Sequence, residues 1–89
     1  MSMIGVKNIN DYSELENVAS ENLMNLLDGE EFTVPMLFGI VNWAKISRGY
    51  KVRLVRYVRD NFKKVCHETS RKDKNYIVYR RVNTDSPND

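Results

Sequence analysis

The chain has 89 residues, a formal net charge of +2, one cysteine and one histidine. That length suits one domain with a modest core, whereas one Cys and one His exclude an intramolecular disulfide and a Cys/His zinc site. The longest apolar run, at 34–41, is too short to cross a bilayer, and the first ten residues lack the apolar segment of a signal peptide, so we expect a cytoplasmic protein.

Residues 1–10 mix apolar and polar side chains, and this segment is typical of either a short edge strand or a loose arm. A helix is predicted from Asp11 to Leu27. Asp28 and Gly29 should end it, because Gly29 is suited to a left-handed cap. The pairs that fit a capping box at its start are Asp11 with Glu14 and Ser13 with Glu16. Its apolar stripe consists of Leu15, Val18, Ala19, Leu23 and Leu26.

A short extended piece is predicted at Glu31–Val34, because a residue before proline is pushed out of helical geometry. A second helix should run from Pro35 to about Ala44, with Gly39 able to break it into two turns. Its many apolar residues indicate a core position, and we expect Trp43 to be buried with a partner for its indole N–H.

A turn is predicted at Lys45–Gly49, in which Gly49 can take a positive φ angle and Ser47 can cap the next helix. That helix, Ser47–Val65, is the longest predicted element and has two faces. One face is apolar and consists of Leu54, Val55, Val58, Phe62 and Val65. The adjoining face is cationic and consists of Arg48, Arg56, Arg59 and Lys63, with Arg53 and Lys64 at its margin.

The last part of the chain is predicted to be β. A short strand at Cys66–Thr69, a polar and cationic turn at Ser70–Asn75 and a β-branched, aromatic strand at Tyr76–Val82 form a hairpin. Residues 83–89 form a polar tail that we expect to be disordered.

The charges are unevenly distributed along the chain. Residues 1–44 carry one cation and seven acids, a net charge of −6, whereas residues 45–82 carry thirteen cations and three acids, a net charge of +10. One end of the molecule should therefore be negative and the other positive, and a positive surface attracts phosphates.

Two helices joined by a short turn, followed by a basic hairpin, predict an α+β fold of the winged helix-turn-helix type, with an arm at 1–10, the domain at 11–82 and a tail at 83–89. The sequence also resembles small single-domain winged-helix proteins of Gram-positive bacteria and their mobile elements. It departs from their pattern at Val55, where that pattern has Gly. The resemblance is carried by Phe32-Thr33-Val34, Leu37-Phe38, Trp43, Ile46, Gly49, Lys51, Leu54 and Arg56.

These features predict double-stranded DNA binding by a transcriptional regulator or accessory factor, in which the second helix of the pair enters the major groove. The candidates for base edges and flanking phosphates are Arg48, Lys51, Arg53 and Arg56, and those for the backbone are Arg59 and Lys63. The candidates in the wing are Arg71, Lys72 and Lys74. Tyr50 and Tyr57 are candidates for stacking on sugar or bonding phosphate. The alternative is that Tyr50 packs on the core and Tyr57 is merely exposed.

Other functions remain open at this point. A winged helix can also bind protein, so one alternative is an interaction or dimerisation module whose acidic N-terminal half faces a basic partner or, in a homodimer, another copy. Another is a small phage or plasmid inhibitor that occupies the nucleic-acid site of a host protein. We expect neither enzymatic activity nor a cofactor, because the sequence has no Gly-rich phosphate loop, nucleophile elbow or metal-ligand spacing. Cys66 and His67 are sequence neighbours and would point in opposite directions on a strand, so a catalytic pair is not expected.

Overall fold

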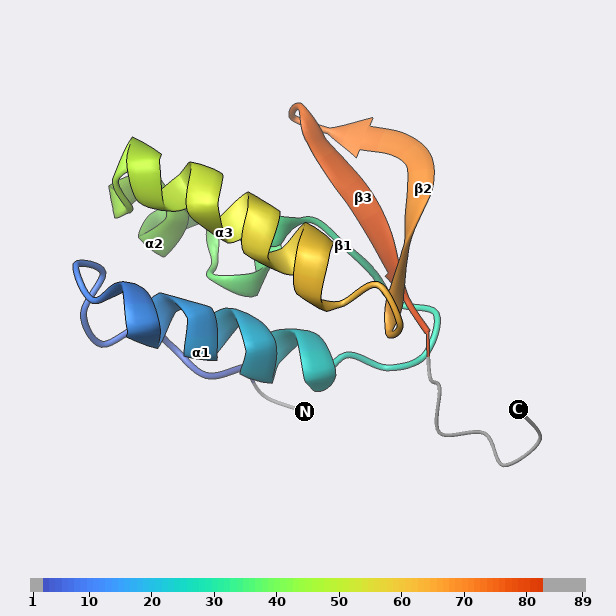
Figure 1. The fold of residues 1–89 in the computed structure, drawn as a ribbon, viewed down its shortest axis with the longest axis horizontal. Helices are drawn as coiled ribbons and strands as arrows, with labels where there is room; N and C mark the ends of the chain where they lie inside the picture. Colours follow the sequence, from blue (N-terminus) through green and yellow to red (C-terminus); the bar gives the residue numbers. More distant parts are fainter. Residues whose placement is uncertain (1–2, 83–89) are drawn as a thin grey trace.

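The computed structural model describes residues 3–82 and shows three α-helices and a three-stranded antiparallel sheet (Figure 1). The helices are α1 (Tyr12–Met24), α2 (Ile40–Lys45) and α3 (Arg48–Asn61), with a 3₁₀ turn η1 (Val34–Leu37) before α2. The strands are β1 (Glu31–Phe32), β2 (Cys66–Asp73) and β3 (Tyr76–Arg81). The predicted α+β class is confirmed. None of the helices in this part of the chain is long and apolar enough to span a membrane.

Helix α1 begins at the predicted cap, because the side chain of Asp11 accepts a hydrogen bond from the Glu14 N–H at 3.3 Å. The Glu14 carboxylate does not complete a capping box but turns to the arm, where it accepts from the N–H groups of Lys7 and Asn8. The helix ends at Met24, three residues before the predicted end, and Gly29 makes the turn into β1 with a φ of +87°.

The N-terminal arm has no strand over residues 3–10, so the predicted edge strand is wrong there. It is attached to α1 by Asn22, a buried side chain that is 1% exposed. The Asn22 amide accepts from the Ile4 N–H at 2.8 Å and donates to the Ile4 carbonyl at 3.0 Å and the Leu37 carbonyl at 2.7 Å. One polar side chain therefore connects the arm, α1 and η1.

The predicted break at Gly39 is confirmed, since this residue has a φ of +84° and separates η1 from α2. Trp43 is buried as predicted, and its indole N–H donates to the Tyr76 hydroxyl at 3.2 Å. This bond links α2 to the first residue of β3.

Helix α3 begins after Ser47, whose hydroxyl accepts from the Tyr50 N–H at 3.2 Å, so the predicted cap is confirmed. Gly49 lies inside the first turn of α3 and has no positive φ, which corrects the prediction of a left-handed glycine. The helix ends at Asn61 rather than Val65, because Phe62 leaves helical geometry with a φ of −123°.

The sheet has the strand order β1-β3-β2, so the last strand lies between the other two. The predicted hairpin is confirmed, but β2 extends to Asp73, and only Lys74 and Asn75 form the turn, with φ angles of 53° and 74°. Two left-handed residues at a hairpin tip match the right-handed twist of the strands. The predicted tail at 83–89 lies outside the described residues.

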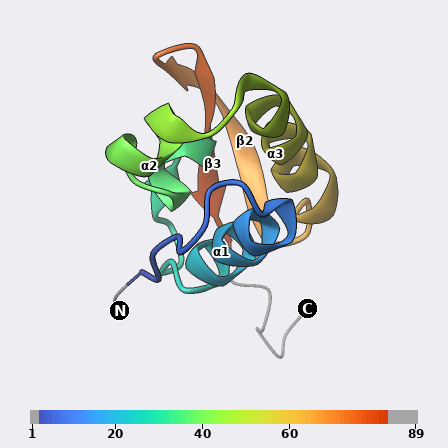
Figure 2. The same ribbon diagram turned by 90° about the vertical axis from the view of Figure 1, so that its left-hand side faces the viewer.

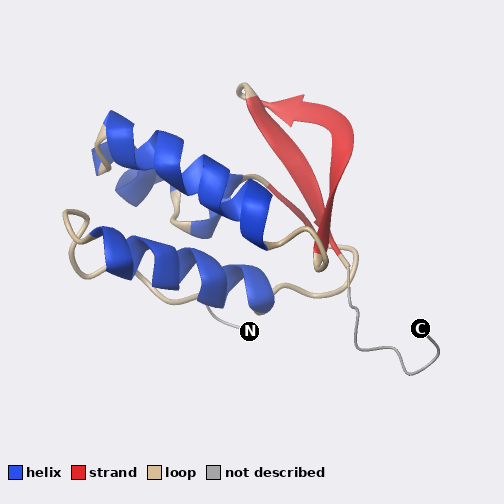
Figure 3. Ribbon diagram, viewed as in Figure 1, coloured by secondary structure: helices blue, strands red, loops and turns tan. Residues whose placement is uncertain are grey.

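The core lies between α1, α3 and the sheet (Figure 2). Leu15, Leu54 and Val58 are fully buried, and Phe32 of β1 stacks on Tyr79 of β3 with ring centroids 5.6 Å apart. The strands lie beside the C-terminal ends of α1 and α3 (Figure 3). In Figures 1 and 2 the hairpin tip lies on the side opposite α1.

Candidate nucleic-acid interface

A cationic hollow of about 400 Å³ lies between the outer face of α3 and the first residue of β3. Its lining contains four cations and no acidic side chain. The lining residues are Arg48, Lys51, Val52, Val55, Arg56, Arg59 and Tyr76, and we call this set the cationic hollow.

The spacing along α3 brings these side chains together. Arg48, Val52, Arg56 and Arg59 follow one another at three- and four-residue steps, which places them on one arc of the helix. Leu54 and Val58 lie away from this arc and are fully buried. Burial of the apolar stripe therefore directs the cations outward.

Most cations of the hollow are available to a ligand. Within residues 3–82, Arg48 and Arg56 are exposed and have no ion-pair partner. The Lys51 Nζ lies 5.6 Å from the centroid of the Trp43 ring, a cation–π contact that neutralises no charge. Arg59 pairs with Asp60 at 3.1 Å, but both side chains are about half exposed and such surface pairs contribute little.

The aromatic and cationic candidates Tyr50, Arg53 and Tyr57 lie on another side of α3 and face α1. The Arg53 guanidinium lies 3.9 Å from the centroid of Tyr12, whose ring is 5.1 Å from that of Tyr50. Tyr57 packs edge-on against Phe62, and partial burial raises the pKa of its hydroxyl. The structure thus separates these three residues from the cationic hollow.

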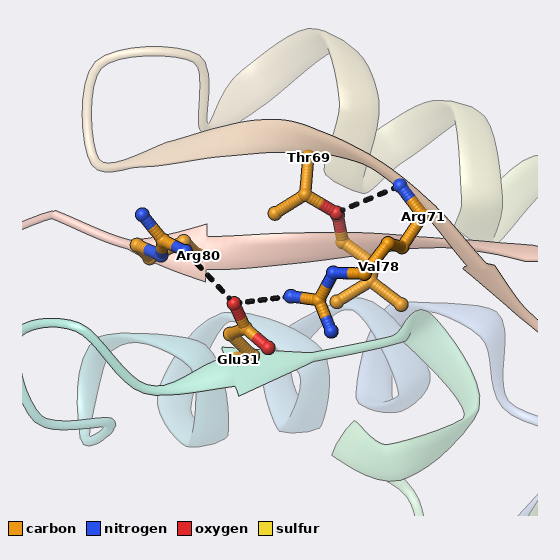
Figure 4. A network of polar contacts seen from close by, with 5 residues as sticks. All are labelled: Glu31, Thr69, Arg71, Val78 and Arg80. Atoms are coloured by element: carbon orange, nitrogen blue, oxygen red, sulfur yellow. Dashed lines mark hydrogen bonds and ion pairs between the residues drawn. The ribbon is translucent and has the colours of Figure 1, made fainter.

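The hairpin candidates are also separated from one another. Arg71 forms an ion pair with Glu31 of β1, and Arg80 donates to the same carboxylate oxygen at 3.0 Å (Figure 4). These hydrogen bonds lower the pKa of Glu31. The Thr69 hydroxyl donates to the Val78 carbonyl at 2.9 Å beside this pair. Arg71 is therefore held against the sheet.

The other two hairpin candidates are exposed and carry no ion pair among the described residues. Lys72 lies opposite Ile77 in the hairpin, and Lys74 lies in the turn. Of the three cations predicted in the turn, Lys74 lies there, whereas Arg71 and Lys72 lie in β2 and Arg71 is partly neutralised.

Lys63 lines a second, smaller hollow of about 250 Å³ between the end of α3 and β2, together with Arg59, His67 and Tyr79. The Cys66 thiol at this place is buried and donates to the Phe62 carbonyl at 3.2 Å. Burial raises the pKa of this thiol to about 11, so it is protonated at neutral pH and a poor nucleophile.

Sequence reasoning missed Val52 and Tyr76 as members of the cationic hollow and assigned Val55 to the apolar face alone. Val52 could have been found, because it is an apolar residue outside the apolar stripe of its own helix. Tyr76 could not, because only the path of the hairpin brings it to α3.

No group of three or more His, Cys, Asp and Glu side chains in the described part of the chain could hold a metal ion. Comparison with protein-family models, curated proteins and solved structures finds no match to this chain.

Proposed function

We propose that this protein is a winged-helix protein that binds double-stranded DNA through α3 and the tip of the β2–β3 hairpin, as a transcriptional regulator or an accessory DNA-binding factor and not as an enzyme. The order of the elements supports the winged-helix assignment. A helix, a short strand, two helices and a hairpin follow one another, and β1 pairs with β3. In this assignment α3 is the recognition helix and the hairpin is the wing.

The observation that carries the proposal is the cationic hollow without acidic lining residues. Arg48 and Arg56 are exposed and unpaired within residues 3–82. Phosphates of a duplex would neutralise them and release counterions. The planar guanidinium groups can also bond two acceptors on guanine in the major groove.

Fluorescence anisotropy with a labelled random-sequence duplex at about 50 and 200 mM salt tests the proposal. We expect affinity to fall steeply between these concentrations, with a slope of roughly 0.9 per phosphate contact. The double variant Arg48→Gln/Arg56→Gln should lose roughly two units of that slope and at least about tenfold in affinity at the lower salt.

A matched control keeps the total charge equal. Lys7→Gln/Lys64→Gln also removes two exposed cations, but from outside the cationic hollow. This variant should bind nearly as tightly as the unchanged protein. Equal losses in both double variants would mean that only net charge matters, and absence of binding at the lower salt would contradict DNA binding altogether.

One observation favours the second candidate, a protein-binding module. Ile40 and Val41 at the start of α2 are 78% and 67% exposed, and apolar side chains at neighbouring positions are suited to a protein interface. Because apolar contacts are little affected by salt, association that persists unchanged at high salt would support this candidate instead of DNA binding.

A further inference from the structure

Val52 lines the cationic hollow between two of its arginines along α3. It lies one helical turn after Arg48 and one turn before Arg56. Its side chain is 48% exposed and is not part of the core cluster, whereas its neighbour Val55 lines the same hollow and packs against the core. Among the lining residues, Val52 is thus the apolar side chain of α3 that is open to a ligand.

The fold does not account for a valine at this position. A β-branched residue loses rotamer freedom in a helix, and an exposed helix position is better filled by Ala, Lys or Glu. Single exposed apolar residues are common on protein surfaces, but this one is surrounded by cations that are suited to DNA. A ligand of the cationic hollow should therefore place an apolar group against Val52 and negatively charged or acceptor groups against the surrounding cations.

In the major groove the 5-methyl group of thymine is the apolar feature of the base edges. We infer that Val52 is a specificity-determining residue that contacts the 5-methyl group of a thymine, with Arg48 and Arg56 contacting the DNA on either side. This inference rests on the proposed DNA binding. The two arginines are separated by about 12 Å along the helix axis, with Val52 midway between them.

The test uses duplexes enriched by selection from a random-sequence library with the unchanged protein. The enriched duplex is then synthesised in two forms, one with thymine and one with uracil in its place. Uracil pairs with adenine as thymine does but lacks the 5-methyl group. We expect the unchanged protein to bind the thymine form about fourfold more tightly, the equivalent of burying one methyl group. The preference should shrink in Val52→Ala, which removes two methyl groups without lowering helix propensity.

Val41→Ala is the matched control, because it removes the same atoms from another exposed valine outside the hollow and should retain the preference for thymine. Equal binding of both duplexes by the unchanged protein would overturn the inference while DNA binding stands. The inference would also be overturned if the protein bound DNA but selection enriched no sequence. An undiminished preference for thymine in Val52→Ala would overturn it as well. Failure to bind DNA at all would overturn the proposed function itself.

Discussion

At the scale of single residues, Cys66 shows how packing sets reactivity. Its thiol is buried at the start of β2, and its pKa is raised from 9.0 to about 11. At pH 8 the thiolate is then about a hundredfold rarer than in the unfolded chain, and the thiolate is the reacting form. We expect iodoacetamide to alkylate the native protein at least about a hundredfold more slowly than the urea-unfolded protein. Similar rates in both states would contradict the buried position of this thiol.

At the scale of elements, Glu31 joins β1 to the hairpin through Arg71 and Arg80. These hydrogen bonds lower its pKa from 4.5, so their contribution to stability is present above that pH and is lost as pH falls through the lowered pKa. Glu31→Gln should therefore lower the melting temperature at pH 7, and the difference from the unchanged protein should shrink well below pH 4.5.

The control for this measurement is Glu21→Gln, since Glu21 is exposed on α1 and forms no ion pair within residues 3–82. Its melting temperature should follow that of the unchanged protein at each pH. A difference between Glu31→Gln and the unchanged protein that stays constant from pH 7 to pH 3 would mean that the ion pairs contribute nothing to folding.

Local patterns predicted the elements better than their ends. The cap at Ser47, the break at Gly39 and the burial of Leu54 and Val58 depend on residues close in sequence, and all three are confirmed. The end of α3 was misplaced because Phe62 and Val65 continue the helical spacing although the chain has already turned. In the candidate site, the direction of Arg53 depends on the ring of Tyr12, which lies on another helix.

At the scale of the whole molecule, the acidic helix α1 and the cationic tip of the hairpin lie apart. Helix α1 with its acids lies on the side opposite the hairpin tip (Figures 1 and 2). Duplex DNA at low salt should therefore slow acetylation of Lys51 and Lys74 severalfold, as measured by mass spectrometry of peptides, and leave Lys7 unchanged. Lys7 serves as the internal control, and equal protection of all three lysines would contradict binding by one side.

The pairing of β1 with β3 joins residues far apart in the sequence, since Glu31 contacts Arg80 across 49 positions. During synthesis at about 5–20 residues per second, Phe32 is made several seconds before the Tyr79 ring on which it stacks. The helices contain the local contacts and can form earlier on the ribosome. Phe32 therefore lacks its stacking partner until the last strand of the sheet has been synthesised.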